Sequence, residues 1–265
     1  MSALSYAVSD SMTMLRRNLK HQLRYPSLTL MVIGIPVILL LLFVYVLGGT
    51  MGAGLDAVSG GRGAYVQYVT PGIVLMAIAG AVQGTAISAA MDMTEGIIAR
   101  FRTMNIARVS VLSAHVYGTV IQTLFGVAVV VGIAALIGFR PHASALDWLA
   151  LAGVVAMTSL ALGWFTVALG ISAKSVETAS NTPMPLMLLP FLGSGFVPTD
   201  SMPTVMRWFA EYQPFTPIIE TIRGLLLGTP IGHQWIAAVA WCAGITAVGY
   251  VWAKAVYNRK AVQAG

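Results

Sequence analysis

The sequence predicts an all-α polytopic membrane protein with six transmembrane helices and with both termini in the cytoplasm. Of the 265 residues, 57% are hydrophobic and only 9% are charged. A soluble domain carries about 25% charged residues, so this composition excludes a water-soluble globular protein. The charged residues are also grouped along the chain, and the gaps between the groups are each long enough to cross a bilayer.

Six uncharged stretches define the expected helices, because a spanning helix needs about 20 apolar residues. The uncharged stretches are residues 25–55, 63–91, 109–139, 148–173, 178–199 and 234–253, and all 15 basic and 9 acidic residues fall outside them. The chain is therefore expected to form a single transmembrane domain over residues 1–265. The expected spans are, in order, about 28–48, 65–90, 110–138, 147–172, 178–197 and 234–253.

The basic residues are distributed unevenly between the two sides of the expected membrane. With the N-terminus inside, 11 basic residues fall in inner segments and 4 in outer ones. Cytoplasmic loops carry an excess of Lys and Arg, so the net charge of +6 indicates topology rather than a site for nucleic acid. The four outer basic residues are Arg62, Arg140, Arg207 and Arg223.

Residues 5–25 precede the first span and are expected to form an amphipathic helix. Val8, Met12, Leu15 and Leu19 recur at helical spacing, while the basic residues occupy other faces. Such a helix lies in the headgroup layer of the inner leaflet. An ordinary solvated basic helix is the alternative.

The inner segment 91–108 mixes charges with apolar residues. Asp92 and Glu95 are followed by Arg100 and Arg102, and the segment also contains Ile97, Ile98, Phe101 and Met104. The pattern predicts a helix with one apolar and one charged face, to which a soluble partner can dock on the cytoplasmic side. A plain charged loop is the alternative.

The second and fifth spans contain residues that affect helix packing. Gly80, Gly84 and Ser88 recur every four residues in the second span, and small residues at this spacing let helices approach closely. Chance in a chain rich in Gly and Ala is the alternative. In the fifth span, prolines such as Pro183 and Pro190 predict a break or a kink.

The segment 198–233 consists of pieces of about ten residues, each too short to cross a bilayer. We expect two short helices that dip into the outer leaflet as a re-entrant region. Glu220 and Arg223 are three residues apart and can pair, which lowers the cost of placing both near lipid. The prolines and the glycine that delimit these pieces are Pro198, Pro203, Pro214, Pro217 and Gly228.

Several kinds of chemistry are missing from the sequence. No carboxylate or lysine lies within a clear span, whereas proton-coupled transporters use such residues as relays. Gly170-Ile-Ser-Ala173-Lys174-Ser175 is the nearest approach to a phosphate-binding loop, and it lacks the required glycines. No metal site and no bound cofactor are expected. Any energy for transport is therefore expected to come from another chain.

These features together resemble the permease subunit of ABC-2 type ATP-binding cassette exporters, in particular the daunorubicin-resistance type. The resemblance covers essentially the whole chain, although Asn105-Ile-Ala stands where many members have a Thr-Pro pair. Besides the basic N-terminal helix, it rests on Glu95-Gly96 with Arg100, Gly195-Phe-Val-Pro198, Met202-Pro203, Gln213-Pro214-Phe-Thr-Pro217 and Arg223-Gly-Leu-Leu-Leu-Gly228.

The resemblance implies a partner ATPase and a second permease. Two permease copies, or two homologous permeases, pair in the inner (cytoplasmic) membrane and bind two copies of a cytoplasmic ABC ATPase, which holds ATP and Mg. The residues implied to contact the ATPase are Asp92, Glu95, Gly96, Arg100 and Arg102. Those implied to line the substrate pathway between the permeases are Gly80, Gly84, Pro183, Pro190, Phe191 and Phe196.

The expected function is export of a hydrophobic drug-like or lipid-like molecule, driven by ATP hydrolysis in the partner, so that the chain itself is not an enzyme. Spans with almost no internal charge suit an apolar cargo. Export of a polysaccharide or lipo-oligosaccharide is the alternative within the family. A membrane anchor or regulatory protein that transports nothing is the alternative from another class.

Overall fold

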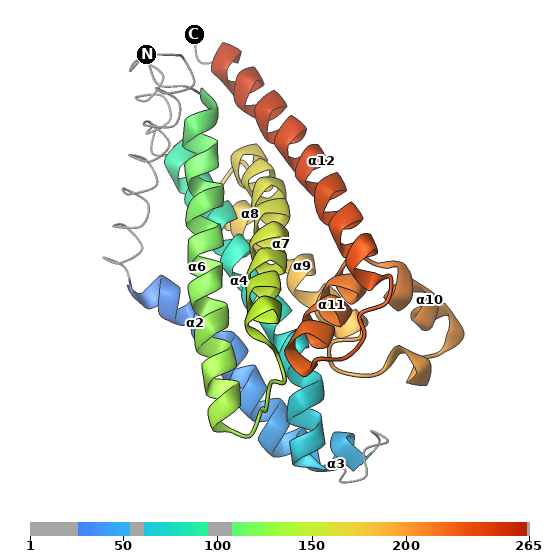
Figure 1. The fold of residues 1–265 in the computed structure, drawn as a ribbon. Coiled ribbons are helices and arrows are strands. Elements are labelled where there is room, and N and C mark those ends of the chain that lie inside the picture. The colour runs from blue at the N-terminus through green and yellow to red at the C-terminus, as the bar shows by residue number, and fades with distance from the viewer. Residues whose placement is uncertain (1–25, 54–60, 95–107, 264–265) are drawn as a thin grey trace.

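The described part of the chain is built from helices that lie roughly along one common direction (Figure 1). The structure is a computed structural model, and it describes residues 26–53, 61–94 and 108–263. The predicted interfacial helix over 5–25 lies outside these residues, as do Glu95, Gly96, Arg100 and Arg102. Only Asp92 of the predicted coupling residues can therefore be placed.

Five apolar helices within the described residues are long enough to cross a membrane. They agree with the first, second, third, fourth and sixth predicted spans to within a few residues, except that the last helix continues beyond the predicted 234–253. The first is divided by a π-helical turn, η1 (Phe43–Leu47), into α2 (Pro26–Leu42) and α3 (Gly48–Ala53). The others are α4 (Arg62–Thr94), α6 (Arg108–Leu136), α7 (Ala145–Ser172) and α12 (Gln234–Gln263).

Helix α4 lies at the centre of the molecule. It contacts α2, α6, α7 and all the shorter helices described below except α10 and η3. Of its most apolar stretch, 72% is buried within the chain, against 22% for the corresponding stretches of the first and last spans. Lipid-facing apolar side chains therefore belong mainly to the peripheral helices, and α4 is packed like a core helix.

Helix α7 begins at a capping box. The Ser144 side chain accepts a hydrogen bond from the Asp147 amide, while the Asp147 carboxylate accepts one from the Ser144 amide at 2.8 Å. These bonds satisfy two backbone donors that a helix start leaves unpaired. Asp147 also limits the uncharged stretch at this end, which explains why the charge gap predicted the helix start closely.

Helices α7 and α12 run in the same direction. Thr158 contacts Cys242, and further along both helices the rings of Trp164 and Tyr250 have centroids 5.0 Å apart. In Figure 1 both helices run from the middle part of the molecule to the end where the C-terminus lies. The chain between Ser172 and Gln234 must therefore return along the length of these two helices.

Residues 176–197, here called the return segment, make this passage without a continuous long helix. They form α8 (Val176–Asn181), α9 (Met184–Leu188) and the 3-10 turn η2 (Leu189–Leu192). Pro183 is the N-cap of α9 and Pro190 lies in the first turn of η2. The break predicted from the proline density is thus present, because proline lacks the amide that a helix interior requires.

Two short helices follow the return segment, as the sequence predicts for 198–233. After η3 (Thr199–Ser201) come α10 (Thr204–Tyr212) and α11 (Phe215–Leu227). Ala210 is the only residue of α10 that is buried, whereas most of α11 is buried against α4, α7 and α12. Gly228 ends α11 with φ of 67°, a left-handed conformation that favours glycine.

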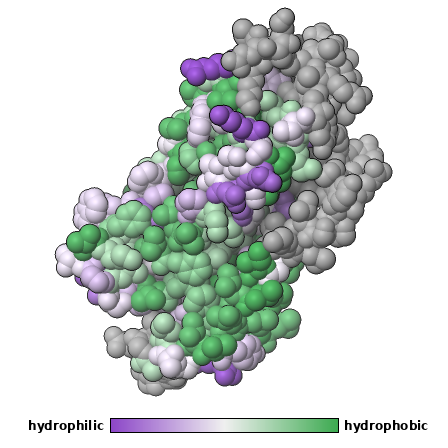
Figure 2. Space-filling view, turned by 180° about the vertical axis from the view of Figure 1, so that it is seen from behind, coloured by the Kyte–Doolittle hydropathy of each residue, from purple (hydrophilic) through white to green (hydrophobic). Residues whose placement is uncertain are grey.

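The molecular surface is strongly apolar. In Figure 2, hydrophobic side chains form a continuous surface over the lower half of the molecule, and hydrophilic ones gather above it and along its margins. A soluble monomer rarely exposes a patch of this extent. The surface and the long apolar helices establish a multi-pass membrane protein. Its strongly exposed apolar side chains include Ile38, Val46, Phe125, Leu136, Leu146, Leu149 and Val251.

Candidate functional site

The return segment lies antiparallel to α4 and is tied to it at both ends. Near one end the Gln83 side chain donates to the Ser180 carbonyl at 2.9 Å. Near the other end the Tyr65 hydroxyl donates to the Phe196 carbonyl at 3.4 Å. Gln83 and Tyr65 are separated by about 27 Å along the α4 axis, at ~1.5 Å per residue. The broken segment therefore travels nearly the ~30 Å thickness of a hydrocarbon core.

A backbone contact between two glycines sets the closest approach of this segment to α4. A Cβ atom added to Gly72 would lie 2.5 Å from the Gly195 carbonyl oxygen, and one added to Gly195 would lie 2.9 Å from the Pro190 carbonyl oxygen and 3.2 Å from the Gly72 Cα. Real Cβ atoms do not approach a backbone this closely, so both positions require glycine. Gly195 belongs to a family-like string in the sequence, but nothing there marks Gly72.

Three phenylalanines form a stack beside the same glycines. The rings of Phe191 and Phe196 are stacked with centroids 4.4 Å apart, and Phe43 contacts Phe196 at 4.7 Å. Phe43 is the first residue of the π-helical turn in the first span. The sequence predicts Phe191 and Phe196 as pathway residues, and the structure brings them together and adds Phe43.

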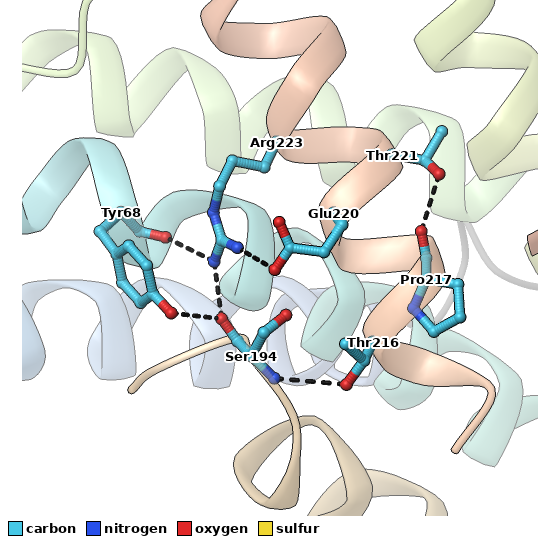
Figure 3. Close-up of polar contacts among 7 residues, drawn as sticks. All are labelled: Tyr68, Ser194, Thr216, Pro217, Glu220, Thr221 and Arg223. Atoms are coloured by element: carbon cyan, nitrogen blue, oxygen red, sulfur yellow. Dashed lines mark hydrogen bonds and ion pairs between the residues drawn. The ribbon is translucent and has the colours of Figure 1, made fainter. Parts of the chain in front are cut away.

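Arg223 is the centre of a polar group that we call the Arg223 cluster: Tyr68, Ser194, Glu220 and Arg223 (Figure 3). The Arg223 Nη2 donates to the Ser194 carbonyl at 2.6 Å and to the Tyr68 carbonyl at 3.4 Å. The Tyr68 hydroxyl donates to the same Ser194 carbonyl at 2.9 Å, and the guanidinium lies 4.2 Å from the centre of the Tyr68 ring. Three separate parts of the chain therefore meet at one carbonyl oxygen.

The charge of Arg223 is balanced by its own helix. Glu220, three residues earlier on α11, forms an ion pair with it, as the spacing predicts. The Arg223 side chain is largely buried and that of Glu220 is partly exposed. An unpaired charge in this apolar setting would cost several kcal/mol, so the pair makes the buried guanidinium tolerable.

A second polar contact lies at the other end of α4, beside the undescribed residues 95–107. The Asp92 carboxylate lies 3.2 Å from Nε2 of His115 on α6. Both side chains are mostly buried, and further along the same helix pair the Thr85 and Thr119 hydroxyls are in contact. Asp92 therefore points between α4 and α6. Its predicted contact with an ATPase remains a prediction, and the scattered histidines of the sequence gave no sign of this pair.

The structure separates other predicted residues from these clusters. Gly80 and Gly84 are half-buried, and among the described residues nothing lies within 4 Å of a Cβ built on Gly84. The close glycine contacts of α4 occur instead at Gly72 and at Gly170 of α7, whose Cβ would meet the Ala86 backbone. A role of Gly80 and Gly84 in a substrate pathway remains a prediction.

The predicted prolines of the region 198–233 serve as helix starts. Pro198, Pro203 and Pro214 are the N-caps of η3, α10 and α11, and Pro217 lies in the first turn of α11. Proline is suited to these positions because the first amides of a helix have no partner within it.

Within the described residues, no three His, Cys, Asp or Glu side chains are grouped as a metal site requires.

Sequence comparison identifies the family of this fold. Residues 10–227 match the family described as ABC-2 type transporter. The chain belongs to the ABC-2 type transporter family. The match ends at the last residue of α11 and so includes α4, the return segment and the Arg223 cluster.

Curated relatives of this ABC-2 chain are drug-resistance permeases. It is 27% identical over 250 residues to the daunorubicin resistance ABC transporter permease protein DrrB1 of Streptomyces coeruleorubidus, covering 93% of this chain and 85% of that protein. It is 25% identical over 215 residues to the probable doxorubicin resistance ABC transporter permease protein DrrC of Mycobacterium tuberculosis, covering 80% of this chain and 76% of that one. The similarity to permease subunits identifies the chain as a transport subunit.

Proposed function

We propose that this chain is the membrane-spanning permease of an ATP-driven exporter that moves a hydrophobic drug-like or lipid-like molecule out across the cytoplasmic membrane. The observation that carries the proposal is the similarity to daunorubicin- and doxorubicin-resistance permeases along most of the chain. The long uncharged helices support an apolar cargo, because a charged or highly polar one is costly to move between such helices.

The proposed topology has six crossings, with the N- and C-termini in the cytoplasm. The parallel α7 and α12, together with the return segment along α4, support a sixth crossing made by broken helices. Such backbone is tolerated at membrane depth where protein covers it. The region 198–233 then lies on the outer side as the re-entrant region.

The proposed assembly contains two permeases and two copies of a cytoplasmic ABC ATPase, as is typical of the family. ATP and Mg are bound and used by the ATPase. The segment 91–108 docks on it, and closure of the ATPase pair moves α4 and α6, which carry this segment between them. The substrate passes between the permeases.

Cells that lack this chain test the function directly. We expect these cells to accumulate doxorubicin, measured by its fluorescence, and to become more sensitive to it. In cells complemented with a tagged chain, we expect the tagged chain to co-purify with an ABC ATPase. In complemented cells, Glu95→Ala or Arg100→Ala is expected to reduce efflux at least about tenfold, the loss that follows from about 1.4 kcal/mol of coupling. Membrane insertion should be unchanged.

Glu177→Ala is the matched control, because Glu177 is exposed at the N-terminus of α8 and lies at the inner turn outside the coupling segment. It should export like the unaltered chain. If the Glu95 and Arg100 variants also export normally and retain the ATPase, the coupling role of 91–108 is wrong. If the unaltered chain neither exports nor binds an ATPase, the exporter proposal is wrong.

The topology predicts which face of the membrane reaches Thr199. In a Cys242→Ala background, which removes the only native cysteine, a Thr199→Cys chain should react with an impermeant maleimide added outside intact cells. A Lys174→Cys chain should react only after the cells are opened. Labelling of position 199 from the cytoplasmic side alone would contradict six crossings with an inner N-terminus.

A further inference from the structure

The turn at residues 193–195 is held in place mainly by side chains of other helices. It lies between η2 and η3, outside regular helix. The Ser194 carbonyl accepts hydrogen bonds from Arg223 and Tyr68, and the Ser194 amide donates to the Thr216 hydroxyl at 3.4 Å. The position of this end of the return segment therefore depends on α4 and α11 rather than on its own secondary structure.

Separating Arg223 from Ser194 and Tyr68 does not leave the charge of Arg223 unpaired. Glu220 and Arg223 form their ion pair within α11, so the pair moves as a unit when α11 moves. The contacts that Arg223 makes with the other elements are hydrogen bonds to two carbonyls and the contact with the Tyr68 ring. A salt bridge between two helices would cost far more to separate in an apolar environment.

The polar groups around the turn are not fully used in this arrangement. Among the described residues, no hydrogen-bond partner is found for the Ser194 hydroxyl, for the Gln213 side-chain oxygen or for Arg223 Nε, and all three atoms are buried. Buried polar atoms normally have partners. Spare donors and acceptors beside a releasable contact favour a site that exchanges partners over one that only stabilises the fold.

The glycine contact provides a surface along which the turn can separate from α4. Gly72 and Gly195 meet backbone to backbone, so no side chains interlock at this point. The phenylalanine stack of Phe43, Phe191 and Phe196 lies beside it. A displacement of the turn would therefore carry Phe191 and Phe196 away from Phe43.

We propose that the Arg223 cluster is a releasable latch that holds the return segment against α4 in the resting protein, with Arg223 as a positioning residue and the Ser194 carbonyl as its acceptor. The latch deepens the proposed export function, on which its role in transport rests. When the latch opens, Phe191 and Phe196 separate from Phe43. Movement of α11 is thereby coupled to separation of the return segment from α4.

The accessibility of residue 194 reports the state of the latch. Ser194 is buried and its hydroxyl has no hydrogen-bond partner among the described residues, so Ser194→Cys changes the site little while the backbone carbonyl is kept. The full chain is reconstituted in nanodiscs, where both faces meet the solvent, and the rate of reaction with a water-soluble maleimide is followed by mass spectrometry. Cys242, which is 1% exposed on α12, is the internal reference for general unfolding.

Three variants weaken the latch to different degrees. In the Ser194→Cys chain, Tyr68→Phe removes one donor and is expected to raise labelling at position 194 about fivefold, as for a neutral hydrogen bond. The combined Arg223→Gln and Glu220→Gln substitutions remove the charged donor without leaving an unpaired carboxylate. They are expected to raise the labelling rate at position 194 about tenfold or more. Arg223→Lys retains a cationic donor and should fall between the unaltered and doubly substituted chains.

Arg207→Gln is the matched control, because Arg207 is also paired with an acidic residue of its own helix but is exposed on α10. It should label like the unaltered chain. Equal rates in all variants, or rises of similar size at position 194 and at Cys242, would overturn the latch. The labelling result is independent of doxorubicin efflux. If the unaltered chain exports but the latch variants show no increase in labelling at position 194, the latch alone is refuted. If labelling at position 194 increases but the unaltered chain does not export, only the exporter proposal is refuted.

Discussion

Replacing Gly72 with alanine is expected to destabilise the protein, although alanine is the better helix former. The added Cβ would lie 2.5 Å from the carbonyl oxygen of Gly195. Both sides of this contact are backbone, so neither can rotate away, and overpacking of this kind costs about 1–3 kcal/mol. The expected result is a melting temperature several degrees lower and a smaller folded fraction by size-exclusion chromatography in detergent.

Gly84→Ala is the matched substitution on the same helix. Among the described residues nothing lies within 4 Å of a Cβ at Gly84, so the change should leave stability equal or increase it by up to about 1 kcal/mol through helix propensity. The two substitutions therefore have opposite expected signs. A Gly72→Ala chain as stable as the unaltered protein would contradict the close contact between α4 and the return segment.

Replacing Asp92 with alanine is expected to reduce ATP-driven efflux at least about tenfold, with insertion into the membrane unchanged. The Asp92–His115 contact joins α4 to α6 close to the ends that carry the segment 95–107. Removing one partner of a mostly buried polar pair leaves the other unsatisfied, which costs about 1–3 kcal/mol. The helices would then no longer move as a unit when that segment is displaced.

Asp92→Asn distinguishes the effect of the hydrogen bond with His115 from the effect of the negative charge of Asp92. Asparagine retains an oxygen that can accept from His115, so this variant should recover most of the efflux. Asp200→Asn is the control for loss of a carboxylate, because Asp200 is exposed and paired with Arg207 on α10, away from the contact between α4 and α6. Drug-stimulated ATPase activity of the purified complex and doxorubicin efflux measure the effect. Normal coupling in Asp92→Ala would show that α4 and α6 transmit movement without this pair.

The fold could be predicted largely from the positions of the charges. The expected span 147–172 corresponds to α7, and the expected span 65–90 lies within α4, because charged residues mark where a helix leaves the hydrocarbon core. The break in the return segment could also be expected, since proline acts on the backbone locally. These features depend on residues near one another in the sequence.

The contacts of the site could be predicted only where they are local. The pairing of Glu220 with Arg223 follows from a spacing of three on one helix. The bond from Tyr68 to Ser194 joins residues 126 positions apart, and one sequence alone contains no signal for it. The small-residue spacing at Gly80 and Gly84 did not locate the close contact, because a chain with 27 glycines offers many such spacings.

The central position of α4 has a consequence for how the protein is made. This helix is synthesised second among the spans, yet most of the helices that cover it come later in the chain. Arg223, which bonds to the Tyr68 carbonyl, follows Tyr68 by 155 residues. Until α11 has been translated, the Tyr68 carbonyl and ring lack their contacts with Arg223. Assembly of this permease can therefore be completed only late in synthesis, and a chain truncated before α11 would lack the last of the helices that cover α4.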